Sequence, residues 1–139
     1  MAFCGGELGN RSIPAPLFLL IGDNRLGQKT LRALDELPED ERPVLCDVSL
    51  WEIATLLALG RWTCQVPFES WLEKATHSRT VTVAPITTPV GLELARLSTG
   101  LHRDPADRII ISTARVLKLP LLTLDRRILA SRLTKRWAV

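Results

Sequence analysis

The chain has 139 residues, of which 46% are hydrophobic and 24% are charged, a composition typical of globular rather than disordered chains. This length suits one domain that buries a core of its own, so we expect residues 1–139 to form a single domain with an atypical, irregular stretch over residues 1–16. Three cysteines without metal-ligand spacing and two distant histidines argue against a zinc site and favour a reduced cytoplasm.

The net charge of +3 conceals an asymmetry along the chain. Residues 1–100 carry nine Lys and Arg against twelve Asp and Glu, a net charge of −3, whereas residues 101–139 carry nine against three, a net charge of +6. A basic segment around a few acids suits a polyanionic substrate whose phosphates approach through metal ions. The alternative is that these cations cover the solvated faces of the last helices.

The first part of the chain offers few regular elements. Residues 1–16 hold several glycines and prolines and indicate no clear helix or strand. Residues 17–21, LFLLI, form the longest strongly apolar run, which fits a strand or a buried helical turn. This run is too short to span a bilayer, and the preceding residues lack a secretory signal pattern, so we expect no membrane association. A helix is expected over residues 26–37.

A strand is predicted over residues 43–47, followed by a helix. Ser49 is expected to be the N-cap of that helix, with Glu52 at the third helical position, because S-x-x-E is the pattern of a capping box. Gly60 should end this helix. Further helices are expected over residues 68–75 and 88–97, and another strand over residues 81–86.

The most informative stretch is residues 101–128, LHRDPADRIIISTARVLKLPLLTLDRRI. Asp104 suits an N-cap, Pro105 the first helical position, and Asp107 a position from which its side chain can reach back to the cap. A short buried strand is expected near residues 120–123, with Asp125 just past its carboxyl end. Since open α/β sheets bind ligands outside the carboxyl ends of strands, Asp107 and Asp125 could share one crevice.

The predicted strands alternate with helices, which is typical of βαβ units and a mainly parallel sheet with helices on both faces. We expect Val44–Cys46, residues 81–84 and residues 121–123 to be strands of that one sheet, since each is a short apolar run bounded by turn or helix signals. A final helix should reach residue 133, and a last strand is expected over residues 137–139.

Five segments carry a resemblance to a known family. Their sequences are GDNRLGQKTLRALDEL (22–37), CDVSLWEIATLLALGRW (46–62), FESWLEKA (68–75), LHRDPADRIIISTA (101–114) and LLTLDRRI (121–128). In this order and spacing the chain resembles a PIN domain, and in particular the VapC-type ribonuclease toxins of bacterial toxin–antitoxin pairs. The resemblance implies an α/β, PIN-like three-layer fold with a central, mainly parallel sheet flanked by helices.

The same resemblance implies a carboxylate site that binds Mg²⁺ or Mn²⁺ and hydrolyses RNA phosphodiesters. By motif position, Glu52, Asp107 and Asp125 would be the catalytic acids, and Asp104 would join them as a metal ligand. Carboxylates about 4 Å apart repel by about 4 kcal/mol at an effective dielectric of 20, so a cation between them is favoured. The family also implies an RNA substrate, a cognate antitoxin protein and a homodimer in the cytoplasm. Helix capping alone also explains Glu52, Asp104 and Asp107.

The chain departs from the family pattern at its first strand. The metal-binding Asp of that strand should fall near Ser12, but Pro14 and Pro16 follow it and oppose a central strand there. Either unrelated residues have replaced the family's first strand, or that strand has been lost through a shifted or truncated reading frame. The third alternative is that the chain is a non-catalytic relative. Two functions therefore remain open. One is a metal-dependent endoribonuclease toxin impaired by the missing Asp, and the other is an inactive PIN-like module that pairs with an antitoxin or RNA.

Overall fold

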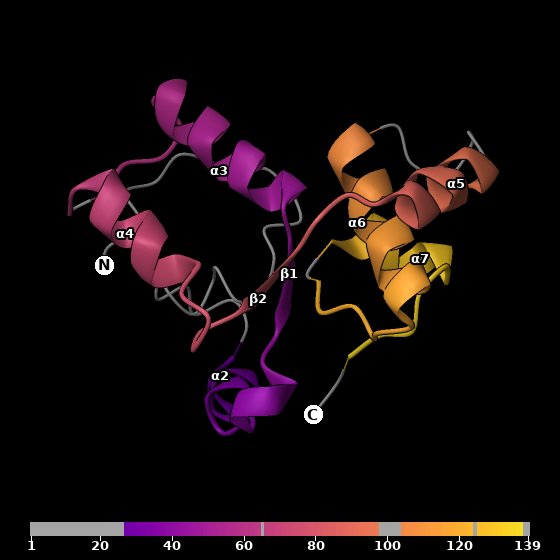
Figure 1. The fold of residues 1–139 in the computed structure, drawn as a ribbon, viewed down its shortest axis with the longest axis horizontal. Coiled ribbons are helices and arrows are strands. Elements are labelled where there is room, and N and C mark those ends of the chain that lie inside the picture. Colours follow the sequence, from indigo (N-terminus) through magenta and orange to yellow (C-terminus); the bar gives the residue numbers. More distant parts are fainter. Residues whose placement is uncertain (1–26, 65, 98–103, 124, 138–139) are drawn as a thin grey trace.

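The computed structural model describes residues 27–64, 66–97, 104–123 and 125–137 of the chain. Helices dominate this part of the chain and alternate with two short strands, as Figure 1 shows. The elements in chain order are α2 (Gln28–Asp35), the 3-10 helix η2 (Glu39–Glu41), β1 (Val44–Cys46), α3 (Val48–Ala58), α4 (Phe68–Ala75), β2 (Thr82–Ala84), α5 (Thr88–Arg96), α6 (Pro105–Leu117) and α7 (Arg126–Ser131).

Strands β1 and β2 pair in parallel, with Val44 opposite Thr82 and Cys46 opposite Ala84. Their connection runs through α3 and α4, as a parallel pair requires a long crossover. Helices α3 and α4 lie on one side of the strand pair, and α5, α6 and α7 lie on the other (Figure 1). The expected α/β class with a parallel sheet flanked by helices is confirmed. No helix in the described ranges is long and apolar enough to cross a bilayer.

The expectation that residues 121–123 would join this sheet is wrong for the part of the chain that the structure describes. There the sheet has two strands, and Leu121 instead forms an isolated parallel bridge with Arg136. The Leu121 N–H donates to the Lys135 carbonyl at 2.8 Å, and the Trp137 N–H donates to the Leu121 carbonyl at 3.1 Å. The last paired segment thus includes Arg136, one residue before the expected strand, of which residues 138–139 lie outside the described ranges.

The helix starts were predicted with mixed success. At α6 the prediction is confirmed, because Oδ1 of the N-cap Asp104 accepts from the Ala106 N–H at 3.0 Å and Pro105 opens the helix. At α3 it is wrong, because the N-cap is Asp47 and Ser49 lies inside the first turn, fully buried. The proposed Ser49–Glu52 capping box therefore does not form. Gly60, with φ of 64°, follows α3 as expected.

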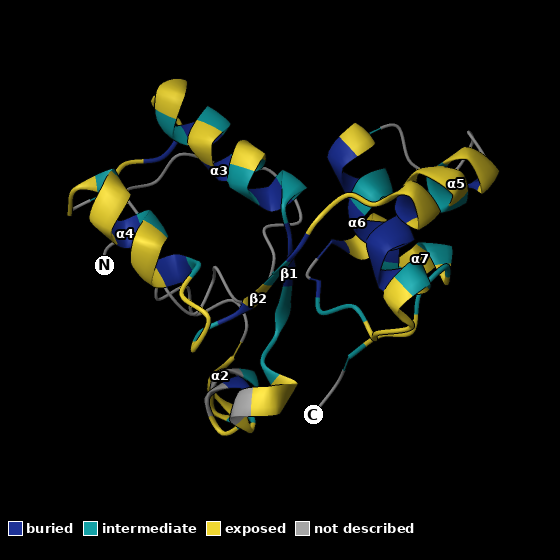
Figure 2. Cartoon of the chain, in the orientation of Figure 1, coloured by how far each residue is buried: buried dark blue, intermediate teal, exposed yellow. Residues whose placement is uncertain are grey.

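The core has two parts. The larger cluster packs β1 and β2 against α3 and α4, and Figure 2 shows buried positions on the facing sides of these helices. Its aromatic centre is Trp71, whose ring lies 4.8 Å from that of Trp62 and stacks on Phe68 at 6.1 Å. Trp62 and Trp71 are buried in this core, whereas Trp51 is 62% exposed. A smaller cluster joins Leu97, Ile111 and Ile128.

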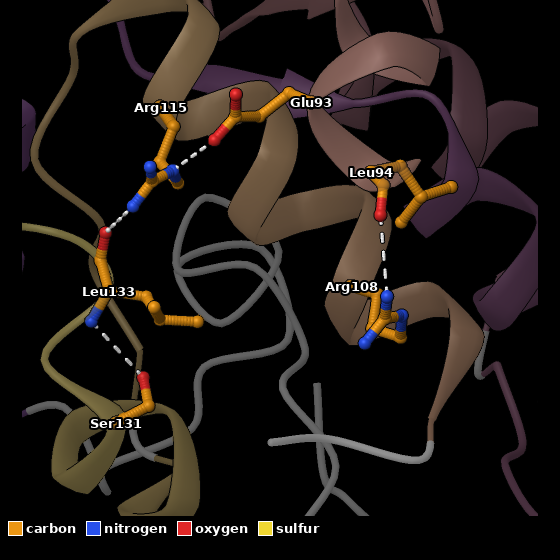
Figure 3. Close-up of polar contacts among 6 residues, drawn as sticks. All are labelled: Glu93, Leu94, Arg108, Arg115, Ser131 and Leu133. Carbon is orange, nitrogen blue, oxygen red and sulfur yellow. Dashed lines mark hydrogen bonds and ion pairs between the residues drawn. The ribbon is translucent and has the colours of Figure 1, made fainter. Parts of the chain in front are cut away.

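Two arginines of α6 bind groups of α5 and of the segment after α7 (Figure 3). The Arg108 Nη2 donates to the carbonyls of Leu94 at 3.3 Å and Leu97 at 3.0 Å, at the carboxyl end of α5. Arg115 pairs with Glu93 and donates from Nη1 to the Leu133 carbonyl at 2.9 Å. Arg108 thus supplies a positive charge where the helix dipole of α5 is negative.

We expect Arg108→Met to lower the free energy of unfolding by about 1.5–3 kcal/mol, because it removes charged donors from two carbonyls in a half-buried place. Arg115→Met is the matched control. Its side chain is 41% exposed, and both its ion pair with Glu93 and its bond to the Leu133 carbonyl lie in an exposed place, so its loss should cost only about 0–1 kcal/mol. Urea unfolding of both variants measures the difference, and equal losses would contradict the assigned role of Arg108.

Candidate functional site

Strand β1 ends where helix α3 begins, and Asp47 occupies that junction. Its N–H donates to the Ala84 carbonyl at 3.0 Å, and its Oδ2 accepts from the Ile86 N–H at 3.1 Å. Both bonds tie the end of β1 to the segment that leaves β2. Asp47 therefore has a structural role at the end of the strand.

Glu52 and Asp107 belong to two helices that contact each other, α3 and α6. Glu52 follows the first turn of α3 and is half-buried, with its Oε2 atom fully buried. Asp107 lies in the first turn of α6 and is only 4% exposed. Figure 1 shows the start of α3, at the end of β1, facing α6. Both acids therefore lie on the carboxyl-end side of the sheet, where open α/β sheets bind their ligands.

Asp104 and Asp125 are both N-caps. Asp104 caps α6, and Asp125 caps α7 by accepting at Oδ1 from the N–H groups of Arg127 at 2.7 Å and Ile128 at 3.4 Å. The backbone N–H of Asp125 donates in turn to Thr123 Oγ1 at 3.1 Å, and Asp125 is 4% exposed. These bonds fix both carboxylates at the starts of their helices.

The fit of a metal ion is judged from the donors that these residues offer. Glu52, Asp104, Asp107 and Asp125 offer hard oxygen atoms, the ligands that Mg²⁺ and Mn²⁺ prefer. Asp107 and Asp125 are almost fully buried, where a neighbouring cation would offset the cost of their charge. Within the described ranges, however, no group of three or more His, Cys, Asp or Glu side chains is arranged to hold a metal ion. The shared site of these acids stays a prediction.

One contact near this junction was not foreseen from the sequence. Cys46, at the end of β1, is buried, and its Sγ lies 3.4 Å from Thr113 Oγ1 of α6. Burial raises the pKa of the Cys46 thiol from its ordinary value, while the contact with Thr113 acts in the opposite direction. The raised pKa disfavours the thiolate form that a cysteine nucleophile needs. Its place is structural, joining β1 to α6.

Comparisons with known proteins identify the family. A family model described as PIN domain matches residues 17–133, more than half of the chain. Ribonuclease VapC22 of Mycobacterium tuberculosis is 36% identical over 86 residues, a stretch that covers 61% of this chain and 64% of that relative. The chain therefore spans less than two thirds of the length of this curated relative. No solved structure matches the chain significantly. From the extent of the family match, the chain belongs to the PIN domain family.

Proposed function

We propose that this protein is a metal-dependent endoribonuclease, the toxin of a type II toxin–antitoxin pair. The observation that carries the proposal is its similarity to a relative named Ribonuclease VapC22, together with a family match over residues 17–133. The acids Glu52, Asp107 and Asp125 support it, since they lie at or near the starts of three helices. Asp104 would lie at the rim of the same site.

When bound, Mg²⁺ or Mn²⁺ would lower the pKa of a water molecule and stabilise charge on the phosphodiester. Glu52 and Asp107 would hold the cation from the contacting helices α3 and α6. Asp125 would orient its carboxylate through its bonds to the backbone of α7. Such a site needs no histidine, cysteine or serine nucleophile, which agrees with the raised pKa of the buried Cys46 thiol.

The RNA would be held by cations near the end of the chain. Lys118 and Lys135 are exposed and line a hollow of about 430 Å³ beside Arg115. Flexible lysines bind phosphate as point charges without reading the base sequence. The lysines of this hollow favour the proposal that the basic carboxyl-terminal segment binds a polyanionic substrate.

The protein partners would cover an exposed apolar stripe on α3. Trp51 is 62% exposed and Leu59, at the C-cap, is 60% exposed. At 3.6 residues per turn, positions eight apart are about 80° apart around a helix, so the two side chains lie on one broad side of α3 without pointing the same way. A stripe of this kind suits the proposed homodimer or a helix of the cognate antitoxin in the cytoplasm.

The second candidate function is an inactive PIN-like module that pairs with an antitoxin or RNA. It is favoured by the lack of an Asp near Ser12 and by the lack of a metal-holding group of acids among the described residues. With fewer carboxylates, the site would bind Mg²⁺ more weakly than a full set does.

Cleavage of total RNA by the full chain distinguishes the two candidates. For the impaired nuclease we expect little cleavage with physiological Mg²⁺ and more with Mn²⁺, which binds such oxygen sites more tightly. Removal of the metal with EDTA should abolish the remaining cleavage. A chain that cleaves RNA equally well in EDTA would contradict metal dependence, and one that never cleaves would favour the binding module.

A further inference from the structure

Ser49 is a buried polar residue whose hydroxyl the fold does not use. It lies in the first turn of α3, and its side chain is 0% exposed. Within the part of the chain that the structure describes, its Oγ has no hydrogen-bond partner. Native proteins leave few buried hydroxyls unpaired, and a role at a catalytic site or near an ion is one reason for keeping such a group.

The helix backbone does not pair with this hydroxyl. A serine inside a helix can donate to the carbonyl four residues earlier. For Ser49 that residue is Leu45, which lies in β1 and pairs with Val83 of β2. Because β1 ends at Cys46 and α3 begins at Val48, Ser49 lacks the helical acceptor that a later position would have. Its donor capacity is therefore available to another group.

Glu52 is the acidic neighbour of Ser49 on the same side of α3. Residues three apart are neighbours on a helix surface, and a helical side chain leans back over the turn before its own Cα. Glu52 therefore extends over the turn that contains Ser49. The raised pKa of the Cys46 thiol agrees, because burial is its main cause and the charges of Asp47 and Glu52 add to it. The Glu52 carboxylate thus acts on the end of β1, just before Ser49.

We propose that Ser49 is a positioning residue of the metal site, an inference that rests on the proposed metal-dependent function. Its hydroxyl donates to the carboxylate of Glu52 and holds that carboxylate toward a divalent cation, which Asp107 binds from the contacting helix α6. A carboxylate has about four lone-pair sites, so it can accept this bond beside its other interactions. A partner of this kind fixes the orientation of a metal ligand, and its loss typically weakens metal binding by about 10–100-fold.

Ser112 offers a matched comparison in the same fold. It is also 0% exposed, and its Oγ also lacks a partner among the described residues. Ser112 follows Asp107 by five residues in α6, which at 3.6 residues per turn is about 140° around the helix. No acid lies three or four residues from Ser112 in either direction along α6. The two serines therefore share burial and chemistry but not the neighbouring acid.

Mn²⁺ binding by the full chain, measured by titration calorimetry, tests the proposal. Ser49→Ala should bind Mn²⁺ about 10–100-fold more weakly than the unmodified chain, because Glu52 loses the group that orients it. Ser112→Ala is the matched control and should bind Mn²⁺ as tightly as the unmodified chain. Since the titration contains no RNA, its result does not depend on whether the chain cleaves RNA.

Urea unfolding without metal separates this role from packing. Both alanine variants remove a buried hydroxyl that has no partner among the described residues, so neither should lower the unfolding midpoint. If Ser49→Ala does lower it, the pair Ser49→Thr and Ser49→Val decides, because threonine and valine have nearly the same shape and differ in the hydroxyl. The Ser49→Thr chain should then bind Mn²⁺ more tightly than the Ser49→Val chain.

Three results would overturn the role of Ser49. Unchanged Mn²⁺ affinity in Ser49→Ala would do so while leaving the proposed nuclease function intact. An equal loss of affinity in Ser49→Ala and Ser112→Ala would indicate a general effect of buried hydroxyls rather than an effect on Glu52. An unmodified chain that binds no Mn²⁺ would overturn this role together with the metal dependence of the proposed function.

Discussion

Asp125→Asn is expected to reduce Mn²⁺-supported RNA cleavage by at least about 100-fold, the upper end of the loss seen when only a partner of a metal ligand is removed. Asn has nearly the same shape and is as good an N-cap as Asp. The bonds from Arg127 and Ile128 to Oδ1 can therefore persist, and the helix α7 should remain in place. The substitution removes the negative charge that a cation requires. It therefore separates capping from metal binding.

Urea unfolding of the same variant supplies the second measurement. We expect the free energy of unfolding of Asp125→Asn to stay within about 0.5 kcal/mol of that of the unmodified chain. Asp125→Ala should lose about 1 kcal/mol, because it removes the cap. Asp40→Asn, at an exposed acid of η2, is the matched control and should leave cleavage unchanged. Full cleavage by a stable Asp125→Asn chain would place the chemistry elsewhere and leave capping as the role of Asp125.

The sequence predicted well those helices whose bounds are set by residues within the same segment. Phe68–Ala75 and Thr88–Arg96 were expected almost to the residue, because apolar spacing and an entering proline fix helices within one segment. At α6, Asp104 and Pro105 marked the start correctly, and Lys118 ends the helix in a left-handed conformation. Capping chemistry acts over a few residues and is therefore readable from the chain alone.

The errors concern interactions between distant segments. Ser49 fits the pattern of an N-cap, but β1 leads directly into α3 and Ser49 is buried in its first turn. Residues 121–123 have the composition of a strand, yet their described pairing is with Arg136. The contact between Cys46 and Thr113 joins residues that no local pattern connects. Which edge a strand uses depends on the assembled sheet, which a short window of sequence does not specify.

The candidate site shows the same division. The helix start that carries Asp104 and Asp107 was placed from local signals, and the structure has both acids there. Asp125 was expected only just past a strand, and the structure makes it the N-cap of α7. Whether their carboxylates share one cation depends on how α3, α6 and α7 pack. The sequence predicted a shared site only through the family resemblance. Among the described residues no group of acids is arranged to hold a metal ion, so the shared site stays a prediction that the cleavage assay tests.

The largest loss of stability is expected for Trp71→Ala. Trp71 is 2% exposed and packs on Trp62 and Phe68, so truncation leaves a cavity at the centre of the main cluster. Removing a buried tryptophan side chain costs about 3–5 kcal/mol, a large part of the 5–15 kcal/mol typical of a whole domain. Urea unfolding should show a lower midpoint with an unchanged slope.

The chain offers a matched control for this substitution in Trp51→Ala. Trp51 lies in α3 but is 62% exposed, so its truncation should change the free energy of unfolding by less than about 0.5 kcal/mol. Trp71→Phe should cost less than Trp71→Ala, because it keeps an aromatic ring against Trp62 and removes a buried Nε1–H that has no partner in the described part of the chain. Equal losses for Trp51→Ala and Trp71→Ala would contradict the assignment of Trp71 to the centre of the core.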